Sequence, residues 1–268
     1  MNYTRKLFLA VLAFLISASS FAQDRKVLFV LSEADTLLLE EGKMKRQTGV
    51  FLNEFYLTYK AILDNGYAVE FATPTGKKAT IDHESTDDKY WKGNLGMKIE
   101  AINFWEKNRA FSNPMKLAEA IEKQDEYIGV VIPGGQGLMV DLIYDHNIPV
   151  LLNTFALDQK AIGLICHAPV FITTIPKIEN PFVGFKVNSV SPFEEFYIEQ
   201  FIMKGKPENR KISRQLKNLG LNYEKGGPGK AFATKDRNLV TSQNPYSSEE
   251  FNGLFLELLR DINTHAAQ

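Results

Sequence analysis

The chain has 268 residues, 44% of them hydrophobic, and its 31 basic and 32 acidic residues give a formal net charge of −1. This length is enough to bury a large core, and one α/β domain can occupy all of it. Acidic and basic residues are nearly equal in number and are interspersed along the sequence. This pattern excludes the basic patch or charged tail of a nucleic-acid-binding protein.

The first 22 residues have the pattern of a signal peptide. Arg5 and Lys6 provide the positive start, residues 7–16 are a short apolar run, and Ala22 is a small residue suited to cleavage. The apolar run is shorter than the roughly 20 residues that span a bilayer. We therefore expect cleavage after Ala22, no membrane anchor afterwards, and an exported protein that is periplasmic or secreted. The mature chain, residues 23–268, is predicted to be a single domain.

Beyond the signal, strand-like and helix-like segments alternate. Continuous apolar runs predict buried strands at residues 26–31, 68–72, 127–132 and 161–165. Apolar residues at helical spacing predict helices over 51–63 and 150–157, and a last helix with a stripe from Phe251 to Ile262. This alternation predicts an α/β fold with a mostly parallel sheet and helices on both faces.

The stretch from Thr75 to Pro114 interrupts this alternation. It is polar, it contains both tryptophans, and it lies between two predicted strands. We interpret residues 75–114 as an insertion over one end of the sheet, either a small lid or an ordinary surface excursion.

The only cysteine, Cys166, ends the predicted strand 161–165 and is followed by His167 and a helix-like stretch over 170–175. A strand that turns sharply into a helix with a thiol at the corner is the pattern of a nucleophile elbow. The helix N-terminus and the adjacent imidazole are expected to stabilise a thiolate of low pKa. The alternative is a cysteine that is simply a small buried apolar residue. Because the chain is predicted to be exported, a thiol without a disulfide partner slightly favours the functional interpretation.

Two further features could belong to the same site. Gly134-Gly135-Gln136-Gly137 directly follows a predicted strand, where backbone N–H groups can approach a substrate oxygen. Glu54 lies in the helix 51–63; in a cleft its carboxyl would have a raised pKa and could exchange a proton near neutral pH. By periodicity alone, a solvated helix glutamate is favoured.

Metal binding is not indicated. His83, His146 and His265 lie in polar stretches without a second ligand at metal-binding spacing. The glycine motif also lacks the spacing of a dinucleotide fingerprint or a phosphate loop. We expect no metal and no cofactor.

At this point the sequence resembles the ThiJ/PfpI superfamily, also called class I glutamine amidotransferase-like. The resemblance rests on four segments that together span most of the mature chain: Gly134 to Gly137, Cys166 to Pro169, Asn238 to Ser248, and Thr48 to Phe55. The last of these is similar to a signature of the larger branch, which contains stress chaperones and glutathione-independent glyoxalases. The family implies a flavodoxin-like three-layer sandwich.

Carried over residue by residue, the resemblance implies roles for the candidates. Cys166 would be the nucleophile, Glu54 the carboxyl that hydrogen-bonds the thiol, and His167 the proton shuttle. A third acid would be Glu195, with Glu194 as the alternative.

Substrate and oxyanion binding would fall to the segments around the elbow: Gly134, Gly135, Gln136, the backbone of His167, and Ala168. The chain departs from the family at three places. The family usually has His at position 136, Gly at position 168, and Ala-His-Pro where this chain has Tyr56-Leu57-Thr58. An added methyl group and lost imidazoles would reshape the pocket.

The resemblance implies a cofactor-free glyoxalase that converts 2-oxoaldehydes such as methylglyoxal to 2-hydroxy acids, or a related deglycase. The expected partner is therefore a small aldehyde substrate, without nucleic acid, and homodimers are common in the family. A non-enzymatic holdase is the alternative from a different class. A cysteine peptidase or amidase is a weaker alternative, and a true amidotransferase is the weakest, because the chain has no synthetase domain to accept ammonia.

Overall fold

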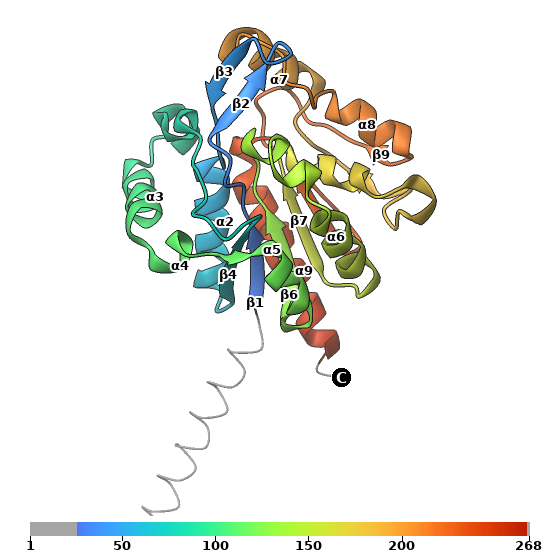
Figure 1. Cartoon of the computed structure of the whole chain (residues 1–268). Coiled ribbons are helices and arrows are strands. Elements are labelled where there is room, and N and C mark those ends of the chain that lie inside the picture. Colours follow the sequence, from blue (N-terminus) through green and yellow to red (C-terminus); the bar gives the residue numbers. More distant parts are fainter. Residues whose placement is uncertain (1–25, 267–268) are drawn as a thin grey trace, which may run out of the picture.

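A computed structural model describes residues 26–266 of the chain, and the predicted signal peptide and its cleavage site lie outside this range. Seven strands form the central sheet (Figure 1), in the order β10-β11-β7-β6-β1-β4-β5. Every neighbouring pair is parallel except β10 and β11. Their bounds are β1 Lys26–Val30, β4 Ala68–Thr73, β5 Met115–Lys116, β6 Tyr127–Ile132, β7 Ala161–Ile165, β10 Ala233–Asp236 and β11 Leu239–Ser242. The predicted mostly parallel α/β fold is confirmed.

The three central strands are the apolar runs of the sequence. β1, β6 and β7 are buried along almost their whole length, as expected of strands covered on both faces. The carboxyl ends of β6 and β7 carry the Gly134 motif and Cys166, so the sheet brings both features to one edge.

Helices cover both faces of this sheet. Helices α2 (Leu52–Asp64) and α9 (Ser248–Ala266) pack against each other on one face, and α5 (Leu117–Glu122) and α6 (Asn147–Leu157) pack on the other (Figure 1). The stripe of α9 lies on β7 closely enough that a Cβ at Gly163 would come within 2.7 Å of the Phe251 ring. The last helix, α9, therefore packs directly against β7, the strand that leads to Cys166.

Smaller elements surround the carboxyl edge of the sheet. A hairpin of β2 (Thr36–Leu39) and β3 (Met44–Gln47) lies beside α7 (Pro192–Tyr197), which continues as a π-helical turn, Ile198–Ile202 (Figure 1). Further along the chain, α8 (Ile212–Leu219) follows, and β8 (Lys186–Val187) pairs with β9 (Asn222–Tyr223).

The stretch 75–114 has two parts. Its first part forms two 3₁₀ helices, His83–Thr86 and Asp88–Trp91, which face the carboxyl edge of the sheet. Its second part forms α3 (Leu95–Lys107) and α4 (Arg109–Ser112), and places Phe104 and Phe111 against Phe55 of α2. Much of this polar stretch is thus anchored in the aromatic core.

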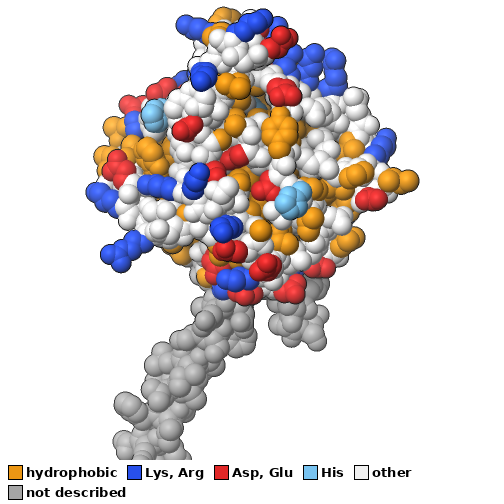
Figure 2. All heavy atoms as spheres, in the orientation of Figure 1, with side chains coloured by type: hydrophobic (Ala, Val, Ile, Leu, Met, Phe, Trp, Pro, Cys, Tyr) orange, Lys and Arg blue, Asp and Glu red, His pale blue; other side chains and the backbone are white. Residues whose placement is uncertain are grey.

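One predicted helix differs in kind. The segment after Cys166 is a 3₁₀ helix, Ala168–Thr174, and not an α-helix. In the part of the chain that the structure describes, no helix is long and apolar enough to cross a membrane. The face shown in Figure 2 mixes acidic, basic and hydrophobic side chains.

Candidate active site

Cys166 occupies a tight turn between β7 and the 3₁₀ helix that follows. Its backbone has φ of +60°, a conformation that is costly for a residue with a side chain. Two hydrogen bonds hold it there: its N–H donates to the Ser242 carbonyl, and its carbonyl accepts from the Val190 N–H, both at 2.8 Å. This geometry is that of a nucleophile elbow.

Glu54 reaches Cys166 from the first turn of α2. The carboxyl is fully buried and lies within hydrogen-bonding reach of the thiol, while its Oε2 accepts from the Gly134 N–H at 3.1 Å. Its Oε1 has no hydrogen-bond partner among the described residues. Burial raises the pKa of Glu54 to about 8, although the bonds to Cys166 and Gly134 act in the opposite direction. Glu54 is therefore an acid that titrates near neutral pH.

The meeting of these two side chains depends on Gly134. A Cβ at this position would lie 2.5 Å from Glu54 Oε2 and 2.7 Å from Cys166 Cβ. The next residue, Gly135, has φ of +112°. Its backbone packs against Gly49, and a Cβ at position 135 would lie 2.2 Å from the Gly49 carbonyl oxygen. The glycine motif thus provides space for the carboxyl to contact the thiol.

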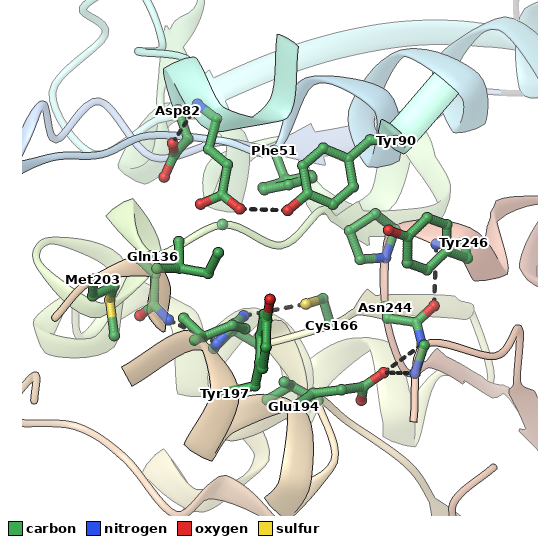
Figure 3. Close-up of a pocket in the computed structure, with 18 of the residues that line it drawn as sticks. Phe51, Asp82, Tyr90, Gln136, Cys166, Glu194, Tyr197, Met203, Asn244 and Tyr246 are labelled. Atoms are coloured by element: carbon green, nitrogen blue, oxygen red, sulfur yellow. Dashed lines mark hydrogen bonds between the residues drawn. The ribbon is translucent and has the colours of Figure 1, made fainter. Parts of the chain in front are cut away.

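His167 also lies next to the sulfur. Its Nδ1 is 3.2 Å from Cys166 Sγ, and its Nε2 is 2.8 Å from the amide nitrogen of Gln136 (Figure 3). The ring is buried, and this burial lowers the pKa of His167 to about 4. The imidazole is accordingly neutral at physiological pH.

Gln136 is the second hydrogen-bond partner of His167 at a position where enzymes with a catalytic triad have a carboxylate. An amide can donate through its nitrogen or accept through its oxygen, so it supports either neutral tautomer of the ring. A carboxylate would only accept and would favour the imidazolium. Gln136 therefore fixes the plane of the ring without favouring its charged form.

The sequence-based expectation of a low thiol pKa is wrong. Burial raises the pKa of Cys166 well above its ordinary value, and the neighbouring carboxyls of Glu54 and Glu194 act in the same direction. A hydrogen bond from the His167 backbone N–H opposes this, but it is the smaller effect. The following helix is a short 3₁₀ segment and contributes little dipole. The resting site holds a thiol, and the thiolate must form when its proton is transferred to a base.

The structure does not bring Glu195 to His167, so the expectation for this third acid is corrected. Its Oε1 accepts from the backbone N–H groups of Lys211 and Ile212 at the start of α8. The alternative, Glu194, lines the pocket, where its Oε1 accepts from Asn244 Nδ2 and from the Gly229 N–H, each at 2.8 Å. Neither carboxylate forms a hydrogen bond with the imidazole, whose ring nitrogens pair with Cys166 and Gln136.

A pocket of about 390 Å³ opens directly above the thiol. Of the predicted site residues, Cys166, His167, Gly135, Gln136 and Glu194 line it. Glu54 and Gly134 lie behind the thiol, and Ala168 is fully buried in the 3₁₀ helix. The predicted substrate-binding residues thus divide into a pocket surface and a supporting layer.

Sequence reasoning missed most of the pocket wall. Aromatic side chains from distant segments form it: Phe51, Tyr90, Phe193, Tyr197 and Tyr246. Phe51 and Tyr246 lie within Thr48–Phe55 and Asn238–Ser248, two of the segments behind the family resemblance, and Tyr90 lies within the stretch 75–114. These three positions were the signals that the sequence offered.

Charged groups on the wall pair with each other. Glu84 binds Arg46 at 2.8 Å, contacts the Tyr90 hydroxyl and lies 3.6 Å from Lys89. Burial raises the pKa of the adjacent Asp82 to about 6. No group of His, Cys, Asp and Glu side chains among the described residues is arranged to hold a metal ion.

Comparison with known proteins identifies the family. The sequence model of a family described as ThiJ/PfpI family-like matches residues 46–179, half of the chain. The chain belongs to this ThiJ/PfpI family.

Its relatives include the protein/nucleic acid deglycase HchA of Escherichia coli O157:H7, which is 23% identical over 235 residues, covering 85% of this chain and 79% of the relative. The relatives' names point to enzymes of the glyoxalase or deglycase type. Among solved structures, glyoxalase III from Candida albicans superposes with a TM-score of 0.64 at 22% identity, covering 90% of this chain and 97% of that one. The 24 kDa Rapid Encystment Protein of Francisella tularensis gives a TM-score of 0.70 at 21% identity, covering 88% and 99%. At such identities these structures support the flavodoxin-like fold alone.

Replacing Gln136 with glutamate tests what the amide does. We expect Gln136→Glu to raise the pKa of His167 by roughly one to two pH units, because a carboxylate stabilises the imidazolium. The measurement is an NMR titration of the histidine ring signals, with Gln136→Ala as the control that removes the hydrogen bond without adding charge. An unchanged titration of His167 in Gln136→Glu would show that this side chain does not govern the ring.

Proposed function

We propose that the protein is a cysteine-dependent, cofactor-free enzyme that converts 2-oxoaldehydes such as methylglyoxal to 2-hydroxy acids, or a related deglycase. The observation that carries this proposal is the buried Glu54 carboxyl against the Cys166 thiol, at the floor of a pocket. A group that titrates at about pH 8 beside a nucleophile is suited to moving protons during the reaction.

The first step would be addition of the thiol to the aldehyde. The Cys166 sulfur forms a bond to the aldehyde carbon, the carbonyl π bond breaks, and the oxygen gains a proton, which gives a hemithioacetal. The thiol proton passes to Glu54 in its carboxylate form, or to His167 Nδ1, 3.2 Å from the sulfur, when the ring is in the tautomer that carries its proton on Nε2. Gly135 and His167 line the pocket beside the thiol, and their backbone N–H groups would stabilise the developing oxyanion.

The second step would move a hydrogen between adjacent carbons. A base removes the proton from the carbon bonded to sulfur, an enediol forms, and the neighbouring carbon is reprotonated. The product is a thioester of a 2-hydroxy acid. Water then cleaves the carbon–sulfur bond, so the acid leaves and the thiol is restored. In sum, one 2-oxoaldehyde and one water give one 2-hydroxy acid, and no cofactor is consumed.

A holdase function is the second candidate, favoured by the exposed aromatic residues of α7 and the following turn. Phe193, Phe196, Tyr197 and Phe201 are each about half exposed or more. Such a surface could bind unfolded chains without using the thiol. A peptidase or amidase has weaker support, because cysteine peptidases use a thiolate–imidazolium pair, whereas burial raises the pKa of Cys166 and lowers the pKa of His167 to about 4.

We also propose export, supported by the composition of residues 1–22. The protein would then meet its small aldehyde substrate outside the cytoplasm. We also propose that it forms a homodimer. If export is correct, the protein recovered from an expressing bacterium begins at Gln23, as determined by N-terminal sequencing. Recovery of the chain with residues 1–22 intact would contradict it.

The activity is tested with methylglyoxal in the absence of glutathione. We expect the mature protein to release lactate, and Cys166→Ala to release none above background, because the hemithioacetal cannot form. The matched control is protection of a heat-denatured protein from aggregation, measured with the same two proteins. Absence of lactate from the folded wild type, together with protection that survives in Cys166→Ala, would favour the holdase function instead.

A further inference from the structure

The walls of the pocket above the thiol are predominantly aromatic. On one side, the rings of Phe51 and Tyr90 meet edge to face with centroids 4.9 Å apart, and Tyr246 lies 5.9 Å from Tyr90 (Figure 3). Phe193 and Tyr197 of α7 also line the pocket, and Figure 3 shows Tyr197 across from Tyr90. A substituent that extends upward from the reacting carbon would therefore lie between two aromatic walls.

The charged groups of the pocket are already paired with protein groups. The Arg46 guanidinium donates to the Ile202 carbonyl at 3.0 Å and binds Glu84 at 2.8 Å. Lys89 lies near Glu84 and over the Tyr90 ring, 4.7 Å from its centroid. Glu194 accepts from Asn244 and Gly229. A substrate with its own phosphate or carboxylate would have to break these pairs, whereas a neutral substrate would not.

The pocket is also larger than a three-carbon aldehyde requires. Its volume of about 390 Å³ falls within the roughly 300–1,000 Å³ of sites that enclose drug-sized ligands. Methylglyoxal would fill only a small part of it and would leave the aromatic rings in contact with water. A larger apolar group would displace that water from both walls.

Building on the proposed function, we infer that the preferred substrates are neutral 2-oxoaldehydes whose ketone carbon bears an aromatic or other large apolar group in place of methyl. Cys166 would attack the aldehyde carbon as before. The substituent would then lie between Phe193 and Tyr246 and hold the reacting carbons over the thiol.

The preference can be measured without turnover, by alkylation of the single cysteine. The probes are 2-bromoacetophenone and bromoacetone, which carry the same bromoketone on a phenyl or a methyl group. With each, the Cys166 sulfur bonds to the methylene carbon, the carbon–bromine bond breaks, bromide leaves with the electron pair, and the thiol proton passes to water. The rate is followed by intact mass, with Cys166→Ala as the blank. The phenyl-to-methyl rate ratio is divided by the same ratio for free glutathione, which removes the intrinsic reactivity of the reagents.

We expect this normalised ratio to be about tenfold or more in the wild type and to fall severalfold in Phe193→Ala and in Tyr246→Ala. The matched control is Phe196→Ala, which removes an equally exposed ring from the same helix but outside the pocket, and it should keep the wild-type ratio. A ratio near one, or an equal fall in Phe196→Ala, would overturn the inference.

The alkylation experiment and the methylglyoxal assay can fail independently of each other. Lactate production with a ratio near one would leave the glyoxalase proposal standing and remove the aromatic preference. A ratio of ten or more without conversion of either methylglyoxal or phenylglyoxal would support the pocket's selectivity and remove the glyoxalase proposal. If both hold, phenylglyoxal should give mandelate with a kcat/KM about tenfold above that for methylglyoxal.

Discussion

The site depends on one buried contact, the Glu54 carboxyl against the Cys166 thiol, made possible by the missing side chain of Gly134. Burial of the Glu54 carboxyl at this contact costs stability. Because the pKa of Glu54 rises from 4.5 to about 8 on folding, the folded protein retains a proton that the unfolded chain releases above pH 4.5. Stability therefore falls as the pH rises from 4.5 to about 8, by roughly 1.4 kcal/mol per pH unit. The φ of +60° at Cys166 adds a further cost.

The same contact divides the chemistry between two residues. His167 is neutral because it is buried, and its hydrogen bond with Gln136 adds no charge, so it can pass a proton but does not hold a charge near the sulfur. Glu54 is the group whose protonation changes near neutral pH. In this account the thiol becomes a nucleophile only when a base next to it takes its proton, and the buried carboxyl is the stronger candidate. A site with this arrangement needs no metal to form its nucleophile.

The sequence predicted the sheet well and the polar contacts of the site less well. The bounds of β6 and β7 follow from continuous apolar runs, and the position of Cys166 at a strand end follows from the same pattern. Glu54 was different: helical periodicity favoured a solvated side chain, and only the family resemblance placed it at the thiol, where the structure has it. Glu195 could not be resolved from its neighbour, because its role depends on the start of α8 at Ile212, far along the chain. The aromatic pocket is assembled from four separated segments, and no local pattern shows such an assembly.

The central claim is that Glu54 is protonated at neutral pH and loses its proton at about pH 8. Infrared difference spectroscopy tests it directly, because the carbonyl stretch of a protonated carboxyl is distinct from the bands of a carboxylate. The spectrum of Glu54→Gln is subtracted from that of the wild type across a pH series. The account predicts a protonated-carboxyl band that is present at about pH 6 and disappears with a midpoint at about pH 8. A difference spectrum that already shows a carboxylate at about pH 6 would contradict it.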